Sequence, residues 1–233
     1  MPGRALSLAR GADAAPTAPG TSQPSRWPPT RRRGKHARVV NGLPTNDQLD
    51  ARLRQHLPQP GDWQPTSLPT AAVLCPLVDH AGQDHLVLVL RPADARQHPG
   101  QIAFPGGKRE GGELPVETAR RECREEIGVP EAEIDVLGSL GARESSSGLL
   151  VHAVVARVPW RPWRPDPREV VRVLTVPLAE LLDEARWTEA PPPASATGVQ
   201  GRTSPHFVLG DQLLWGLTGR FVRDLLAVLR ALP

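Results

Sequence analysis

The sequence of 233 residues is poor in cysteine, with only Cys75 and Cys123. Two cysteines are too few for a disulfide framework, and these two lack the spacing of metal ligands. The sequence also lacks any stretch near the roughly 20 apolar residues that a membrane span requires. No uninterrupted apolar segment follows Arg4, as a secretory signal would need. These absences predict a cytoplasmic protein with free thiols and without a membrane partner.

Acidic residues are nearly absent from the first part of the chain. Residues 1–40 contain eight basic residues and a single acid, Asp13, so they carry +7, and residues 41–233 carry −4 of the total of +3. Glycine and proline supply ten of these forty residues, which predicts a disordered basic leader. Three interpretations stay open: a dispensable or misassigned start, a transit peptide, or an arm for nucleic acid or a membrane surface.

The remaining residues alternate strand and helix signals. A short helix over 45–57 and a Pro/Gly linker are predicted within 41–69, and the main domain over 70–233. Strands are predicted at 71–79 and 85–91 as a hairpin, at 102–104, near 134–140 and 150–158, at 169–176, and at 206–215 as a second hairpin. Further helices are predicted at 114–128, at 177–185 with Pro177 in the first position, and at 216–232. Interleaved strands and helices predict a layered α/β or α+β domain.

The helix predicted over 114–128 has an apolar face and an acidic face on a helical wheel. The apolar stripe consists of Val116, Ala119, Cys123 and Ile127. The acidic face consists of Glu122, Glu125 and Glu126. Like charges at this spacing destabilise a helix by a few tenths of a kcal/mol per pair, roughly. Either this face is solvated, with arginines interspersed, or it binds a hard divalent cation.

The segment before this helix favours the cation. "PGG" (105–107) predicts a glycine-rich turn after a strand, where the backbone can approach a metal or a phosphate. Gly107, five residues, Glu113, seven residues and then "RECREEIGV" (121–129) follow it. This spacing resembles the Nudix box, G-x5-E-x7-R-E-U-x-E-E-x-G-U, in which U is a bulky apolar residue. Every fixed position of that motif is met.

The resemblance implies a Nudix-type α/β/α sandwich with a mixed β-sheet. It implies that Mg²⁺ or Mn²⁺ is bound by Glu122, Glu125, Glu126 and the carbonyl of Gly107. It also implies that Glu113 and Arg121 hold the loop and the helix together by an ion pair. Members of the family hydrolyse a nucleoside diphosphate linked to another moiety.

A carboxylate takes the proton of the attacking water in such a reaction. The catalytic candidates are Glu125, Glu126 and Glu169. We expect Glu126 to be the base and take Glu169 as the second candidate. The alternative for Glu169 is a solvated residue at the start of a strand.

Residues 86–107 resemble a second signature, which precedes the box in coenzyme A pyrophosphatases. The matching residues are Arg91, Arg96, His98, Gly100, Gln101, Phe104, Pro105, Gly106 and Gly107. Pro92 and Ala95 depart from the pattern. This resemblance implies substrate binding by Arg91, Arg96, His98 and Gly106, because guanidinium groups pair bidentately with phosphate oxygens. Each arginine can instead pair with a surface acid, and the histidine can instead order its loop.

The two signatures together imply metal-dependent hydrolysis of coenzyme A or acyl-coenzyme A. The expected products are 3′,5′-adenosine bisphosphate and (acyl-)phosphopantetheine. One alternative is a Nudix hydrolase for another nucleoside diphosphate derivative, such as ADP-ribose; another is a non-catalytic, ligand-sensing Nudix domain. The expected partner is a small-molecule substrate, with no nucleic acid, and a homodimer is one expected assembly. Deletion of residues 1–40 is expected to leave hydrolysis unchanged.

Overall fold

Two β-sheets and four α-helices make up the part of the chain that the computed structural model describes, residues 46–194, 196 and 203–232. The predicted leader at 1–40 lies outside the described residues. The helices are α1 (Asn46–His56), α2 (Pro115–Ile127), α3 (Leu178–Leu181) and α4 (Gly216–Ala231). The strands are β1 (Thr70–His80), β2 (Gln83–Leu90), β3 (Ile102–Ala103), β4 (Gly106–Lys108), β5 (Asp135–Glu144), β6 (Leu150–Arg157), β7 (Arg172–Pro177), β8 (Trp187–Ala190), β9 (Ser204–Leu209) and β10 (Gln212–Leu214). Two 3₁₀ turns lie at Glu131–Glu133 and Glu184–Arg186.

The larger sheet contains seven strands and is mixed. Its main order is β3-β2-β1-β6-β5, with β4 paired to β1 and β7 paired to β2. Strands β1 and β6 run parallel, whereas the other pairs are antiparallel. The smaller sheet has the antiparallel order β10-β9-β8. Both predicted hairpins, β1–β2 and β9–β10, are confirmed.

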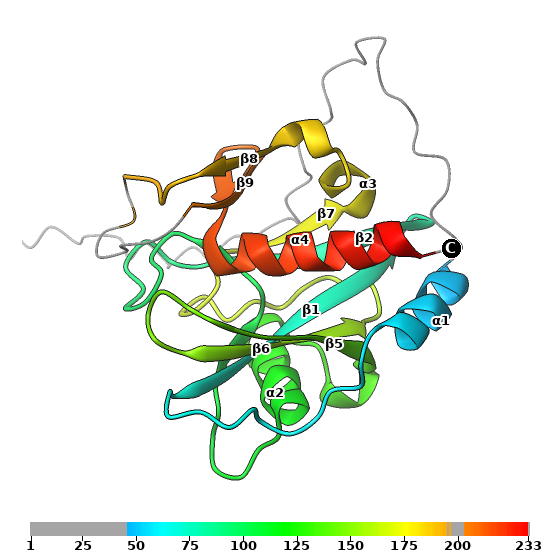
Figure 1. The fold of residues 1–233 in the computed structure, drawn as a ribbon, viewed down its shortest axis with the longest axis horizontal. Coiled ribbons are helices and arrows are strands. Elements are labelled where there is room, and N and C mark those ends of the chain that lie inside the picture. The colour runs from blue at the N-terminus through cyan, green and yellow to red at the C-terminus, as the bar shows by residue number, and fades with distance from the viewer. Residues whose placement is uncertain (1–45, 195, 197–202, 233) are drawn as a thin grey trace, which may run out of the picture. The chain divides into compact units, whose positions relative to one another are not determined.

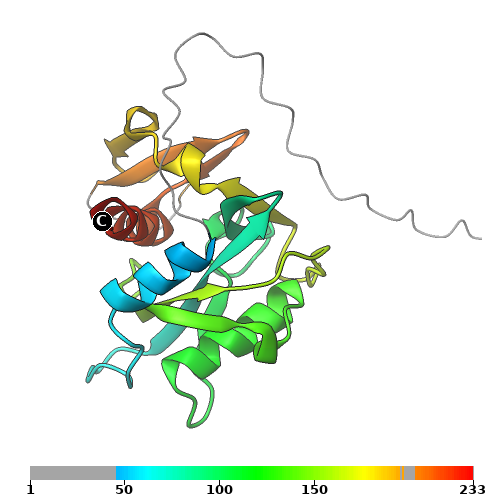
Figure 2. The same cartoon turned by 90° about the vertical axis from the view of Figure 1, so that its right-hand side faces the viewer.

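Helices cover both faces of the larger sheet (Figures 1 and 2). Successive side chains of a strand point to opposite faces, and β2 shows this clearly. Leu86 and Leu88 pack in one apolar cluster with α1 and α4, whereas Val87 and Val89 pack in a second cluster with α2. A strand buried on both faces reads as a continuous apolar run, as this one does. The predicted α/β/α sandwich with a mixed sheet is confirmed.

Helix α2 forms as its sequence predicts. Pro115 occupies the first position, and Gly128 ends the helix in the left-handed conformation with φ of 75°. Ala119, Cys123 and Ile127 are fully buried on one stripe. Cys75, the other cysteine, is likewise buried and free. No helix in the described part of the chain has the length and apolar composition of a membrane span.

The segment "PGG" was predicted as a turn, and this is wrong. Gly106 and Gly107 belong to β4, which pairs with Val73 and Ala72 of β1. Strand β4 therefore runs antiparallel beside the first residues of β1, and it also contacts α2. Gly106 and Gly107 permit this close approach because they have no side chains.

Two later elements differ from their predicted bounds. The strand predicted at 169–176 begins only at Arg172, because the carbonyl of Asp166 accepts hydrogen bonds from the backbone N–H groups of Glu169 and Val170 and makes a turn there. The helix predicted at 177–185 is α3 alone, with Pro177 before the first turn rather than in it. Strand β8 was not predicted, since its four residues show no alternation of apolar and polar side chains.

Candidate active site

Three carboxylates meet at the edge of α2. Glu122 and Glu126 lie one turn apart on the helix, and Glu169 reaches them from the turn before β7. One oxygen of each lies within 4.8 Å of the others. We call these three residues the acidic cluster. The sequence indicated Glu169 only as a second candidate for the base; the structure brings it into contact distance of the helix.

Glu126 is the buried member of this cluster, with 1% of its surface exposed. Its Oε2 accepts a hydrogen bond from the backbone N–H of Gly106 at 3.1 Å, and its Oε1 lies 3.4 Å from Nη1 of Arg91. Burial raises the pKa of Glu126 to about 8 despite these two partners. Burial also raises the pKa of Glu122, although Arg121 donates to that carboxylate.

The acidic cluster fits a divalent cation. Its donor set consists of carboxylate oxygens, the ligands that Mg²⁺ and related hard ions prefer. Two of the three carboxylates are disfavoured as anions by burial, so that nearby positive charge is needed to keep them ionised. The side chain of Arg91 supplies part of this charge at 3.4 Å from Glu126.

Glu125 lies apart from the acidic cluster. Its carboxylate accepts hydrogen bonds from Arg121 at 3.1 Å and from Arg124 at 2.8 Å, and its side chain is 44% exposed. Helical spacing places Glu125 beside its two neighbours, but the flanking arginines turn its side chain toward solvent. Its role as a metal ligand and catalytic residue, implied by the resemblance, stays a prediction.

The two glycines of β4 allow the strand to lie close to the acidic cluster and to β1. A Cβ atom on Gly107 would lie 2.2 Å from Oε1 of Glu122. A Cβ atom on Gly106 would lie 2.5 Å from the carbonyl oxygen of Ala72 and 2.6 Å from Cα of Val73. The first clash is with a movable carboxylate and the second with backbone.

These two glycines therefore predict different defects. Gly107→Ala is expected to weaken Mn²⁺ binding by roughly 10–100-fold, because the new methyl group displaces the carboxylate of Glu122. Gly106→Ala is expected to lower the free energy of unfolding by roughly 1–3 kcal/mol, because β1 must shift. Titration with Mn²⁺ followed by paramagnetic resonance, and urea unfolding, measure the two effects. Equal loss of stability in both variants would contradict the assignment of the first clash to Glu122.

Arg121 joins the loop before α2 to the helix. Its Nε donates to Glu113 Oε1 at 2.7 Å, and its Nη2 donates to the carbonyl of Lys108 at 3.0 Å. Glu113 Oε2 also accepts from the hydroxyl of Thr118 at 2.8 Å. These hydrogen bonds, that of Arg121 first, lower the pKa of Glu113 to about 2. The ion pair implied by the resemblance is present, and neither partner lines the pocket.

The low pKa of Glu113 predicts a pH-dependent contribution to stability. A carboxyl whose pKa is lowered by folding stabilises the protein above its unfolded value, here 4.5, and this contribution is lost as pH falls toward about 2. We expect Glu113→Gln to lower the urea midpoint at pH 6, with the difference from the wild type shrinking between pH 4.5 and pH 3. A difference in urea midpoint that is the same at pH 6 and at pH 3 would exclude the ion pair as its source.

Trp63 is a structural contact that the sequence did not reveal. Its indole Nε1 donates to the carbonyl of Glu113 at 2.7 Å, and the guanidinium of Arg109 lies 5.4 Å from its ring centre. The ring of His152 packs edge-on against it, with centroids 5.0 Å apart. The segment predicted as a Pro/Gly linker thus anchors the loop of the box. A single tryptophan in such a segment was the available signal.

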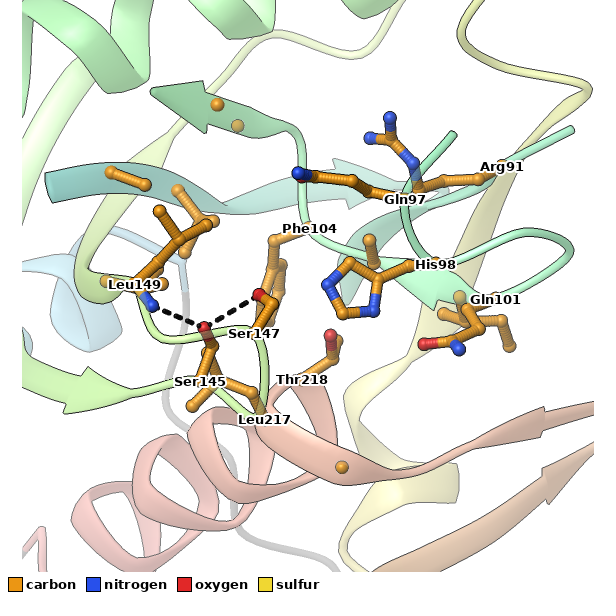
Figure 3. Close-up of a pocket in the computed structure, with 18 of the residues that line it drawn as sticks. Arg91, Gln97, His98, Gln101, Phe104, Ser145, Ser147, Leu149, Leu217 and Thr218 are labelled. Carbon is orange, nitrogen blue, oxygen red and sulfur yellow. Dashed lines mark hydrogen bonds between the residues drawn. The ribbon is translucent and has the colours of Figure 1, made fainter. Parts of the chain in front are cut away.

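A pocket of about 560 Å³ opens beside the acidic cluster (Figure 3). Residues of both sequence signatures line it, together with Glu169: Arg91, Arg96, His98, Gly106, Gly107, Glu122 and Glu126. Residues that sequence reasoning did not assign to the site also line it, from two later segments: Ser145, Ser146, Ser147, Leu149, Leu217 and Thr218. Trp215, which precedes α4, lines it too.

Arg91 and His98, which line the pocket, show features expected at a binding site. The Nε of Arg91 is buried and has no hydrogen-bond partner among the described residues. His98 adopts a left-handed backbone with φ of 53°, which is strained for a residue with a Cβ atom. Burial, and to a lesser extent the neighbouring Arg91, lower the pKa of His98, so its ring is neutral near pH 7.

This chain is similar to known proteins in sequence and in fold. The family model of the NUDIX domain matches residues 68–196. The uncharacterized Nudix hydrolase NudL of Yersinia enterocolitica is 35% identical over 185 residues, covering 78% of this chain and 91% of that protein. The NudL of Photorhabdus laumondii is 34% identical over 177 residues, covering 75% and 92%. A solved MutT/nudix family protein from Enterococcus faecalis has a TM-score of 0.49 at 15% identity, covering 78% and 73%.

The family match spans more than half of the chain and includes β4, α2 and the two glutamates that α2 supplies to the acidic cluster. The NudL proteins are matched over about nine-tenths of their length. The chain belongs to the Nudix hydrolase family.

Proposed function

We propose that the protein hydrolyses the diphosphate of coenzyme A or acyl-coenzyme A. The products are 3′,5′-adenosine bisphosphate and (acyl-)phosphopantetheine. One observation carries this proposal: a single pocket is lined by the acidic cluster and by Arg91, Arg96 and His98 of the second signature. A diphosphate ester that bears an additional phosphate needs partners for two regions of negative charge, and this pocket offers both.

Different residues of the pocket have different roles in this reaction. Glu122 and Glu126, with Glu169 beside them, would hold the divalent cation, which would supply positive charge to the diphosphate and activation of the attacking water. Arg91 and Arg96 bind phosphate oxygens, with the buried, unpaired Nε–H of Arg91 available for one of them. The Gly106 N–H and Arg91 hold the carboxylate of Glu126 in place.

The reaction breaks one bridging P–O bond. The oxygen of water forms a bond to one phosphorus, the bridging oxygen leaves with the other phosphate, and a carboxylate accepts the proton from water. Burial of Glu126 and exposure of Glu169 support Glu169 as this base, in preference to our first sequence-based candidate. Glu169 is also the only member of the acidic cluster that is not on a helix, so it can adjust its position to the water.

Product analysis tests the proposal. The full chain is incubated with Mg²⁺ or Mn²⁺ and, in parallel, with coenzyme A, acetyl-coenzyme A and ADP-ribose. We expect 3′,5′-adenosine bisphosphate from the first two substrates. Turnover of ADP-ribose without turnover of either coenzyme A substrate would reject the proposal and favour the other nucleoside diphosphate derivative. The choice between the two metals, the cytoplasmic location, the domain limits and a homodimer stay predictions.

A further inference from the structure

The pocket has two walls of different chemistry. Its charged lining residues come from the segment 91–108, from α2 and from the turn at Glu169. The lining residues within 145–151 and 215–221 include no charged side chain. The first segment is the turn between β5 and β6 with the start of β6, and the second is the first part of α4 with Trp215 before it. We call this second set of residues the neutral wall.

Hydroxyl groups on the neutral wall are held in fixed positions. Ser145 Oγ accepts a hydrogen bond from the backbone N–H of Leu149 at 3.0 Å and lies 3.0 Å from Ser147 Oγ (Figure 3). Thr218 reaches from the first turn of α4 into the space between Ser147 and His98 (Figure 3). Within the described residues, the Thr218 hydroxyl has no hydrogen-bond partner in the protein. Ser147, which is held by Ser145, and Thr218, whose hydroxyl is unpaired within that part of the chain, therefore offer uncharged hydrogen-bonding groups to a ligand.

Two leucines give this wall an apolar surface. Leu149 and Leu217 are only partly buried and pack against the main apolar cluster, so each presents its remaining surface to the pocket. An apolar surface with a few fixed hydroxyl groups suits a chain of methylene groups interrupted by amides. It does not suit a phosphate, because the neutral wall contains no cation to offset the desolvation of that charge.

The opposite wall suits the nucleotide half. Arg91 and Arg96 carry the positive charge that phosphate requires, and planar guanidinium groups also stack on bases. The acidic cluster lies in the same pocket as both walls. A substrate whose diphosphate is at this cluster thus has one wall available for each half.

We propose that the neutral wall binds the uncharged, amide-bearing arm of the substrate, and that the opposite wall, with Arg91 and Arg96, binds the nucleotide half. This inference rests on the proposed function, and it fixes the direction in which coenzyme A lies in the pocket. The neutral wall then determines which substrates are accepted, because a nucleoside diphosphate without such an arm leaves the hydroxyl group of Thr218 without a partner and the pocket surfaces of Leu149 and Leu217 uncovered.

A pair of matched variants of the full chain tests the inference. Leu149→Asp places a carboxylate on the neutral wall, and Leu213→Asp makes the same change at a half-buried leucine outside the pocket. We expect Leu149→Asp to lower kcat/KM for coenzyme A by roughly tenfold or more relative to the Leu213→Asp control. Thr218→Val, which keeps the shape of the side chain, is expected to lower it by about 2–10-fold, the effect of one neutral hydrogen bond. Mn²⁺ affinity should be unchanged in all three variants.

Binding of the arm alone provides a readout without turnover. Pantetheine, the arm without phosphate, is titrated into the wild-type chain and followed through backbone amide resonances. We expect shifts at residues 145–149 and 217–218, which Leu149→Asp abolishes. Shifts confined to residues 91–98, or a kcat/KM of Leu149→Asp within twofold of the control, would overturn the inference. Failure of the wild type to cut coenzyme A would reject the proposed function instead, and pantetheine binding would then still support or overturn the neutral wall by itself.

Discussion

Glu126→Gln is expected to abolish nearly all turnover while leaving the fold intact. The substitution removes the buried carboxyl group of the acidic cluster, and kcat/KM should fall by on the order of 10²–10³-fold, since a metal site contributes several kcal/mol to lowering the barrier. Glutamine keeps an oxygen that accepts the hydrogen bond from Gly106. Because burial disfavours the ionised carboxylate, the free energy of unfolding should stay equal or rise. Steady-state kinetics, Mn²⁺ titration and urea unfolding measure the three quantities.

Glu125→Gln is the matched comparison for this result. It makes the same chemical change on the same helix, but at a carboxylate that pairs with Arg121 and Arg124. If Glu125 stays in those pairs during turnover, its variant should lose much less activity than Glu126→Gln. An equal loss in the two variants would show that Glu125 leaves its arginines to bind the cation, as the family resemblance implies. Full activity in Glu126→Gln would disprove the metal site.

Arg157→Met is expected to cause the largest loss of stability, roughly 3–5 kcal/mol. Arg157 lies at the end of β6, and its guanidinium is 2.6 Å from Asp50 of α1 and 2.6 Å from Asp84 of β2. The side chains of the three residues are only 14%, 13% and 3% exposed. Without the arginine, two buried carboxylates face each other without a cation. Urea unfolding at pH 7 measures the loss.

A solvent-exposed ion pair provides the control for this loss of stability. Arg143 binds Asp224 through two hydrogen bonds of 2.7 and 2.8 Å, but its side chain is 45% exposed. Arg143→Met should therefore cost less than about 1 kcal/mol. If both variants lose the same amount, burial is not the reason for the importance of Arg157. Turnover by Arg157→Met should be retained under conditions in which it is folded, because Arg157 does not line the pocket.

Local signals predicted the parts of the fold that depend on local chemistry. Helix α2 begins at Pro115 and ends before Gly128 as expected, because each residue fits the backbone geometry of a helix end. The apolar runs of β1 and β2 predicted a hairpin whose strands are buried on both faces. The residues from Gly107 to Gly128 predicted the family, because their types and their spacing match the Nudix box.

Contacts between distant segments could not be predicted from a single sequence. Glu169 joins the acidic cluster because β7 pairs with β2 and carries the preceding turn to α2. Ser147 and Thr218 were not assigned to the site from the sequence, and they line one pocket only because β6 pairs with β1 and α4 packs on the sheet. Glu125 was placed with its neighbours by helical geometry, and the competition from two arginines was not visible in the spacing.

Helix α4 follows the acidic cluster in the chain, and this order has a consequence for protein synthesis. Every carboxylate of the acidic cluster precedes Trp215 in the chain, whereas half of the residues of the neutral wall are Trp215 and residues after it. A ribosome completes the chain from its amino end, and structure forms as segments emerge. The nascent protein thus contains the whole acidic cluster before it contains the whole of the neutral wall. The surface that we propose for the substrate arm is complete only once α4 has emerged and docked.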